Sequence, residues 1–95
     1  MVSKIKLEEV FSSRGATNVI RLLIKREEIN VTALCRLTGL SHKQVEKYLK
    51  RLVNYGLVKE KRFGKIRIFA LNNDNKYVSL LREFVKNWES QAFRQ

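Results

Sequence analysis

The chain has 95 residues, which is enough for one domain with a buried core but too short to add an elaborate catalytic cleft. Its 20 Lys and Arg residues outnumber 9 Asp and Glu residues, giving a formal net charge of +11. One cysteine excludes an internal disulfide, and one cysteine with one histidine cannot supply a clustered four-ligand metal site.

Such an excess of positive charge suggests an anionic partner. Nucleic acid is the commonest one, and an anionic membrane surface is the main competitor. No segment approaches the roughly 18 consecutive apolar residues of a membrane span, so we expect no membrane partner. The N-terminal residues MVSKIKLEEVF lack the apolar core and cleavage site of a signal peptide, which predicts a cytoplasmic protein. In a reducing compartment, Cys35 is expected to be a small buried hydrophobe, although it could pair between two chains.

Apolar spacing predicts two helices in the first part of the chain, over residues 4–11 and 16–26. Gly15 and the serines before it separate them, and glycine at such a break predicts a turn or a tight junction. The second helix has a wide apolar face and is expected to be the central support of the core. Ile29 and Val31 then predict a very short strand at the edge of a later hairpin.

The next segment has the pattern of two helices joined by a short turn. Thr32 is expected to cap a helix that runs through Thr38, and Gly39 to end it in a left-handed conformation. Ser41 is expected to cap the following helix, over residues 42–55. Two helices joined by a glycine-containing turn are the sequence form of a helix-turn-helix. The second helix has one apolar side and one side of amines and amides, which suits a groove lined by phosphates and base acceptors.

A basic hairpin follows this helix. Strands are expected over residues 57–62 and 65–71, joined at Phe63 and Gly64. The segment from 41 to 67 holds nine Lys or Arg residues and two Glu residues, so it carries +7 of the total charge of +11. That concentration is an electrostatic footprint for a polyanion.

A final helix is expected from Lys76 to about Arg94, capped by Asp74 or Asn75. Its apolar side chains fill less than half of the circumference. A domain of this size can bury only part of that stripe, so the remainder is a candidate dimer surface. A small-molecule pocket is a more distant interpretation. The expected dimerisation residues are Tyr77, Leu81, Phe84, Val85, Trp88 and Ala92.

This order of elements resembles the winged helix-turn-helix proteins, particularly small archaeal regulators similar to the ArsR-type group. The likeness rests on VTALCRLTGL (31–40), SHKQVEKYLKRL (41–52) and YGLVKEKRFGKIRIFAL (55–71), together with FSSRG (11–15). The GLVKEKRFGKIRIFAL part is the most specific.

The resemblance implies an α+β, mainly α, winged helix-turn-helix fold with a small antiparallel β-hairpin wing and a C-terminal dimerisation helix. Residues 1–74 would form the DNA-binding domain and residues 75–95 the dimerisation helix. It further implies a DNA-binding transcriptional regulator, usually a homodimer. Metal-sensing members use cysteine clusters, so Cys35 alone predicts no metal response.

The candidate DNA contacts fall in two groups. On the recognition helix they are Ser41, His42, Lys43, Gln44, Lys47, Lys50 and Arg51. On the wing they are Lys61, Arg62, Lys65 and Arg67. The first turns of the helix are expected to reach base edges and the later positions to reach phosphates, with a solvated helix face as the alternative. Phe63 is expected to pack under the wing rather than between bases.

The preferred function is therefore a sequence-specific, nucleoid-associated regulator of double-stranded DNA. Its recognition helix would lie in the major groove, and its wing on the adjacent minor groove or backbone. Sequence-independent chromatin or architectural binding and a protein-interaction module remain alternatives. Because no set of nucleophile, base and orienting group is present, we expect no enzyme activity and no cofactor.

Overall fold

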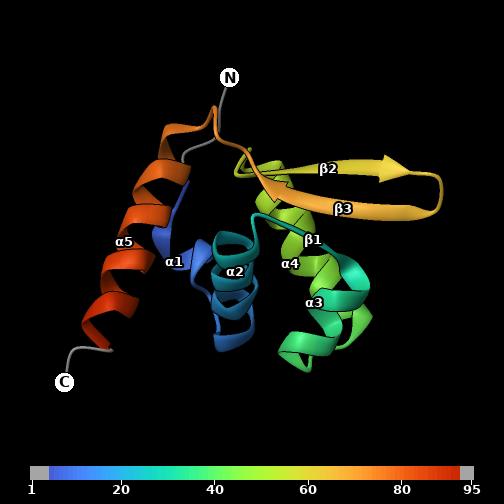
Figure 1. The fold of residues 1–95 in the computed structure, drawn as a ribbon, viewed down its shortest axis with the longest axis horizontal. Coiled ribbons are helices and arrows are strands. Elements are labelled where there is room, and N and C mark those ends of the chain that lie inside the picture. Colours follow the sequence, from blue (N-terminus) through green and yellow to red (C-terminus); the bar gives the residue numbers. More distant parts are fainter. Residues whose placement is uncertain (1–4, 93–95) are drawn as a thin grey trace.

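The computed structural model describes residues 5–92, without the side chain of Ala92, and over this range the chain forms five helices and three strands (Figure 1). In chain order these are α1 (Leu7–Val10), α2 (Arg14–Arg26), β1 (Glu28–Asn30), α3 (Val31–Thr38), α4 (His42–Asn54), β2 (Val58–Phe63), β3 (Ile66–Leu71) and α5 (Lys76–Ala92). The expected elements are present, and the mainly α, α+β fold class is confirmed. The expected ends at Lys4 and Arg94 lie outside the described residues.

Polar side chains fix where the helices begin. The Ser13 side chain accepts a hydrogen bond from the backbone N–H of Ala16 and starts α2. Asn30 accepts one from the backbone N–H of Ala33 at 2.7 Å, so it caps α3 in place of the expected Thr32. Thr32 lies within the first turn because α3 begins one residue earlier, at Val31.

The three strands form one antiparallel sheet in the order β1-β3-β2. The expected short strand is present at β1, because Ile29 pairs with Phe69 on β3, but Val31, which was also expected in it, begins α3 instead. On the other side of β3, β2 continues to a Phe63–Ile66 pair, beyond which the hairpin closes. The closing residues are Gly64 and Lys65, one position later than expected, and Gly64 has a φ of +62° that favours glycine. This β2–β3 hairpin is the wing, and it projects from the body of the molecule (Figure 1).

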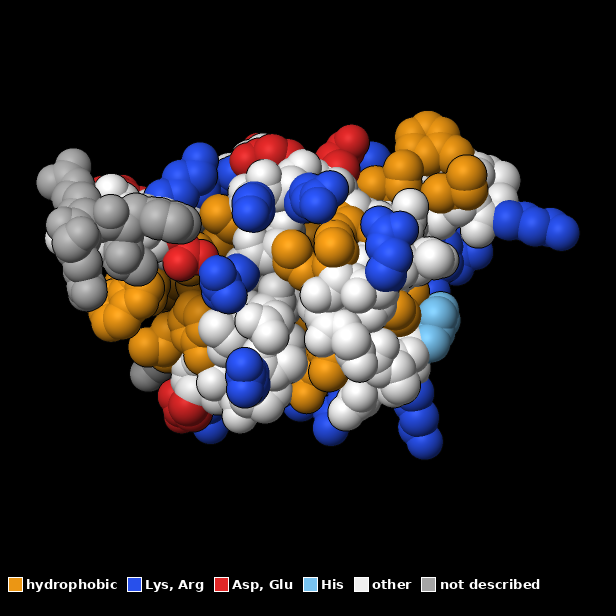
Figure 2. Space-filling view, turned by 60° about the horizontal axis from the view of Figure 1, so that its bottom comes forward, with side chains coloured by type: hydrophobic (Ala, Val, Ile, Leu, Met, Phe, Trp, Pro, Cys, Tyr) orange, Lys and Arg blue, Asp and Glu red, His pale blue; other side chains and the backbone are white. Residues whose placement is uncertain are grey.

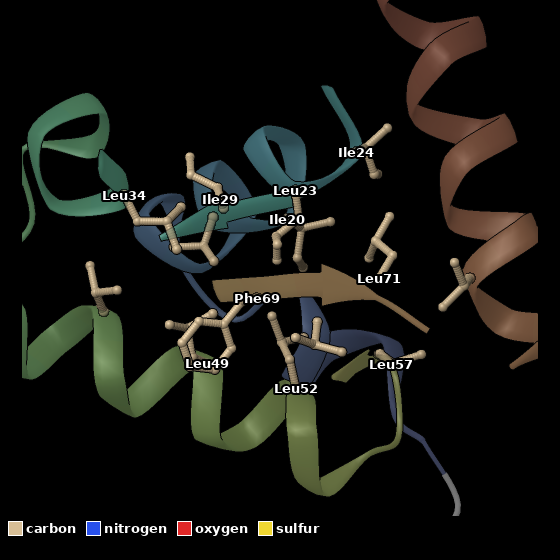
Figure 3. Close-up of a cluster of buried hydrophobic side chains, with 14 of the residues drawn as sticks. Ile20, Leu23, Ile24, Ile29, Leu34, Leu49, Leu52, Leu57, Phe69 and Leu71 are labelled. Carbon is tan, nitrogen blue, oxygen red and sulfur yellow. The ribbon is translucent and has the colours of Figure 1, made fainter. Parts of the chain in front are cut away.

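The core lies between α2, α4 and the inner face of the sheet (Figure 3). Phe69 is its largest fully buried side chain, at 1% exposure, and lies beside Leu49 of α4 in the close-up. From the other side, α2 contributes side chains that are at most 2% exposed, including Ile20 and Leu23. Burial of this kind contributes roughly 25 cal/mol per Å² of apolar surface. The expectation that α2 is the central support is confirmed.

The helix-turn-helix is held closely against the start of α2. Gly39 ends α3 with a φ of +74°, as its position in the sequence predicts. Leu40 follows and is half-buried. Gly15 lies in the first turn of α2 rather than in a loop, and a Cβ there would come within 3.2 Å of the Leu40 side chain and 3.3 Å of Tyr48. Gly15 is therefore a tight junction that lets α2 approach the turn.

The last helix, α5, runs beside α1 and α2 at the end of the molecule opposite the wing (Figure 1). Val78 and Val85 on the inner side of α5 are buried in the core. Arg21 of α2 also forms an ion pair with Glu89 of α5. Asn75, one of the two expected caps, accepts a hydrogen bond from the backbone N–H of Tyr77 at 2.9 Å. In the described part of the chain, no helix is long and apolar enough to cross a membrane.

Candidate nucleic-acid interface

Helix α4 is divided along its length into a buried side and an exposed side. Val45, Leu49 and Leu52 are buried in the core. The opposite side is exposed and carries the residues expected to contact DNA, namely Ser41, His42, Lys43, Gln44, Lys47 and Lys50. This partition agrees with the helical periodicity of the sequence. It leaves three amines and one amide free to approach a ligand.

The N-terminus of α4 is closed by a reciprocal pair of hydrogen bonds. The Ser41 hydroxyl accepts a hydrogen bond from the backbone N–H of Gln44, and the Gln44 side-chain oxygen accepts one from the backbone N–H of Ser41, each at 3.2 Å. Gln44 is thus held at the start of the helix by its oxygen, while its amide NH₂ group can still donate. The first turn contains no acidic residue, so the positive end of the helix dipole remains available to an anion.

One expected recognition-helix contact is engaged inside the protein. Arg51 is half-buried, and its Nη1 donates hydrogen bonds to the Ser12 hydroxyl at 2.9 Å and to the Glu9 carbonyl at 3.3 Å. The Tyr55 hydroxyl donates to the Glu9 carboxylate, and Tyr48 shares a hydrogen bond with Ser13 at 2.9 Å. These contacts fasten α4 to the N-terminal helices and so fix its direction.

A second set of contacts joins α4 to the wing. Arg67 of β3 donates from Nε to the Glu60 carboxylate of β2 at 2.7 Å and from Nη1 to the Glu46 carboxylate of α4. Arg62 also donates to Glu60, at 3.1 Å. The guanidinium carbon of Arg67 lies 5.2 Å from the centre of the Phe69 ring, within the range of a cation–π contact. Arg67 therefore points into the angle between wing and helix, away from the tip.

The hydrogen bonds and ion pairs in this cluster shift the pKa values of Glu60 and Arg67. The hydrogen bond from Arg67, followed by that from Arg62, holds the pKa of the Glu60 carboxyl below its usual value, although burial opposes the shift. The same bonds to Glu60 and Glu46 raise the pKa of Arg67. Each of the two carboxylates, Glu46 and Glu60, is paired with an arginine. They consequently repel an approaching phosphate less than unpaired carboxylates would.

The far end of the wing is both basic and apolar. Lys65 is exposed, and the Arg62 side chain is 67% exposed despite its bond to Glu60. Lys61 lies farther back, where its Nζ forms an ion pair with Glu28 of β1 at 2.8 Å. Phe63 is 62% exposed, so the expectation that it packs under the wing is wrong. Alternation along β2 places it on the face opposite the one that covers the core.

A separate apolar groove lies between α5 and the N-terminal helices. Its cavity volume is about 830 Å³. The aromatic side chains of Phe84 and Trp88 lie 5.9 Å apart and are 56% and 68% exposed. Arg21 and Glu89, which form the ion pair between α2 and α5, are at its margin. Figure 2 shows hydrophobic side chains at this α5 end of the molecule, and others at the opposite end beside protruding Lys and Arg side chains.

The expected dimerisation residues are divided between this groove and the core. Tyr77, Phe84 and Trp88 are exposed, whereas Leu81 is half-buried and Val85 packs in the core of its own chain. The side chain of Ala92 lies outside the described residues. The groove also contains Leu7 and Leu80, which are 66% and 63% exposed and were not among the expected residues. Leu80 belongs to the apolar stripe of the last helix, so the stripe was the available signal.

The remaining candidate chemistry is sparse. Cys35 is half-buried rather than fully buried, and its thiol is free. Among residues 5–91 no group of three or more His, Cys, Asp or Glu side chains could hold a metal ion.

Residues 17–59, from α2 to the start of β2, match a family model described as "Winged helix-turn-helix DNA-binding". Solved structures with the same fold include the AntR antimony-specific transcriptional repressor, at 18% identity and a TM-score of 0.73, with 92% of this chain and 77% of that one covered. The transcriptional repressor PagR of Bacillus anthracis is 19% identical with a TM-score of 0.69, covering 83% of this chain and 86% of that one.

A third similar structure is a homodimeric winged helix-turn-helix DNA-binding domain from Mycobacterium bovis. It is 19% identical, has a TM-score of 0.58, and the match covers 99% of this chain and 94% of that one. No curated protein sequence gives a significant match. The winged helix-turn-helix fold expected from the sequence is confirmed.

Proposed function

We propose that this winged helix-turn-helix protein is a transcriptional regulator that binds specific sites in double-stranded DNA as a homodimer. One observation carries the proposal: the exposed amines of α4 and the basic end of the wing belong to two elements that Arg67 joins directly. The element proposed to enter the major groove, α4, and the element proposed to contact the adjacent groove or backbone, the wing, are therefore held next to each other. The matched family model, whose description includes DNA binding, and the folds of two known repressors support this assignment.

In the proposed complex, the N-terminal half of α4 lies in the major groove. Lys43, Gln44 and Lys47 face base edges and the phosphates beside them, because lysine can donate to guanine and a glutamine amide can donate to base acceptors. His42 and Lys50 flank them and contact phosphates, which fix register without reading sequence. Arg51 and Arg67, although expected among the contacts, support the interface from within the protein.

The wing lies on the adjacent minor groove or backbone. Arg62 and Lys65 lie at its end and are exposed, and Lys61 adds a positive charge farther from the tip, next to β1. Together with α4 they supply seven of the chain's 20 Lys and Arg residues, and basic residues that contact phosphates make binding strongly dependent on salt. Specificity would come from the major-groove contacts, and affinity from both elements.

We further propose that a second copy of the chain covers the apolar groove at α5. The exposed aromatic residues Tyr77, Phe84 and Trp88 lie together there with Leu80, and such a cluster is unfavourable in water. The homodimeric Mycobacterium bovis domain has a similar fold. A two-fold dimer would place two α4 helices in successive major grooves about 34 Å apart, so that the protein reads a pseudo-palindrome.

Two other classes of function are distinguishable from this one. A sequence-independent architectural protein would bind through charge alone, whereas a protein-interaction module would need no DNA affinity. No catalytic activity, metal or cofactor forms part of the proposal.

Competition binding separates these functions. Labelled genomic fragments that the protein retains at physiological salt are challenged with unlabelled random DNA, and displacement is followed by fluorescence anisotropy. A specific regulator resists displacement from a few fragments and is readily displaced from the rest. Equal displacement from every fragment supports architectural binding, and the absence of any salt-sensitive binding supports an interaction module.

A further inference from the structure

The end of the wing carries a pair of apolar side chains that the protein itself leaves uncovered. Phe63 and Ile66 face each other across the hairpin as the last paired residues before the turn. They are 62% and 56% exposed. Figure 2 shows hydrophobic side chains at this end of the molecule, next to protruding Lys and Arg side chains.

The position of the pair in the hairpin explains why the core does not cover it. Side chains alternate between the two faces of a strand, so Phe63 shares a face with Lys61 and lies opposite the face of Glu60 and Arg62. The inner face holds Phe69, which is buried against α4. Phe63 and Ile66 therefore point away from the core, and more than half of each residue's surface is exposed.

Charge and size limit what can cover this pair. Arg62 and Lys65 flank it and are exposed, which favours a polyanion. A stable protein interface buries about 800 Å² on each partner, far more than two side chains at a hairpin end can offer. A DNA minor groove is about 6 Å wide, and its walls present the C–H groups of deoxyribose between two rows of phosphates. Those dimensions and that chemistry match an apolar pair flanked by cations.

We propose that Phe63 and Ile66 enter the minor groove of duplex DNA and pack against its sugar walls, while Arg62 and Lys65 contact the bordering phosphates. Apolar side chains are used in this way by proteins that widen or kink the minor groove. The inference rests on the DNA-binding function proposed above. It assigns the wing a contact that is apolar as well as electrostatic.

The test uses two variants: a double variant that carries both Phe63→Ser and Ile66→Ser, and the single variant Lys65→Ala. Their affinities for the protein's selected DNA site are measured at several salt concentrations. Removing the apolar pair should weaken binding about tenfold. It should not change the salt slope, which is the slope of log binding constant against log salt concentration, because no phosphate contact is lost. Lys65→Ala should instead lower the slope by about one unit. Val53→Ser, which removes another partly exposed apolar side chain far along α4, is the matched control and should bind normally.

Hydroxyl-radical cleavage, which attacks deoxyribose from the minor groove, locates the contact. The wild-type protein should protect sugars beside each recognition-helix site, and the double variant should lose that protection while keeping its circular dichroism spectrum. Unchanged affinity and protection in the double variant would overturn the inference, as would a fall in the salt slope equal to that of Lys65→Ala. Altered sedimentation with normal DNA binding would assign the pair to a second protein chain and also overturn it. If the wild-type protein binds no duplex, the proposed function itself fails.

Discussion

Arg67 on the wing and Glu46 on α4 are joined by a hydrogen bond between guanidinium and carboxylate. Since Arg67 also bonds Glu60 on the neighbouring strand, one side chain connects α4 to both strands of the wing. The Phe69 ring lies 5.2 Å from the same guanidinium, within the range of a cation–π contact. A hairpin that projects from a small domain would otherwise be attached only through its base. We therefore expect the placement of the wing relative to α4 to depend on this contact.

Replacing Arg67 with Ala should weaken DNA binding without removing a phosphate contact. Affinity is expected to fall because the wing is less constrained, because Glu46 loses its arginine partner and because Glu60 keeps only Arg62. The salt slope should stay constant, and stability should change by less than about 1 kcal/mol, since ion pairs near the surface contribute little. Measurements of affinity against salt, with thermal unfolding, test this expectation.

The conservative variant Arg67→Lys provides the control. Lysine keeps the charge but lacks the planar fork that reaches two carboxylates, so it should restore little of the affinity. Full recovery with lysine, or a slope lower by about one unit in the alanine variant, would show that Arg67 itself contacts DNA.

The Glu60 carboxyl should titrate at lower pH than an unperturbed glutamate, because Arg67 and Arg62 donate hydrogen bonds to its ionised form. A carboxyl with a depressed pKa stabilises the folded state above its unfolded-state pKa, and that contribution is lost as pH falls through the folded-state pKa. The loss should thus occur in acid, below the ordinary glutamate value of about 4.3. Carboxyl chemical shifts in an NMR titration measure it. An Arg67→Ala variant in which the Glu60 pKa did not rise would contradict the assignment.

Lys47 tests the role of the exposed side of α4. Replacing it with Ala should weaken binding and, if the amine contacts a phosphate, lower the salt slope by about one unit. Lys25 is also exposed, but it lies in the last turn of α2, so Lys25→Ala is a suitable control with little expected effect. Equal losses in the two variants would indicate general attraction by net charge.

The dimer surface can be tested by placing a charge in the groove at α5. Trp88→Glu should produce a monomer in sedimentation experiments, with the helical content retained, because Trp88 is 68% exposed within one chain. DNA affinity should fall steeply, since a monomer contacts a single half-site. Asn87→Glu adds the same charge at a neighbouring exposed position outside the groove and should stay dimeric. A wild-type protein that sediments as a monomer would disprove this surface.

Local signals explain why much of the fold was predictable from the sequence. Gly39 and Ser41 mark the turn of the helix-turn-helix through backbone conformation and capping, which depend on neighbours a few residues away. Gly64 similarly marks the wing turn. The apolar spacing of α4 gave its buried and exposed sides, because helical rotation alone sets them. The exposed lysines of the candidate site follow from the same periodicity.

The misplaced features depend on contacts between distant parts of the chain. Arg51 and Arg67 are basic residues in the expected DNA-contacting segments, and the sequence alone favours DNA contacts for them. In the structure, however, Arg51 bonds a hydroxyl and a carbonyl, and Arg67 bonds two carboxylates, all from other elements. Phe63 was expected to pack under the wing, yet the pairing register places it on the outer face of the wing, where it is 62% exposed. Val85 belongs to the stripe of α5, but packing against α2 rather than periodicity decides which part of the stripe is buried.

We propose that two copies of α4 read a specific DNA sequence while the two wings contact the flanking grooves. Sequencing the genomic fragments that the protein retains at physiological salt tests it most directly. We expect a small set of fragments that share a pseudo-palindrome, with half-sites about one helical turn apart, roughly 10 base pairs from centre to centre. Even recovery of fragments from across the genome, without a shared motif, would contradict it.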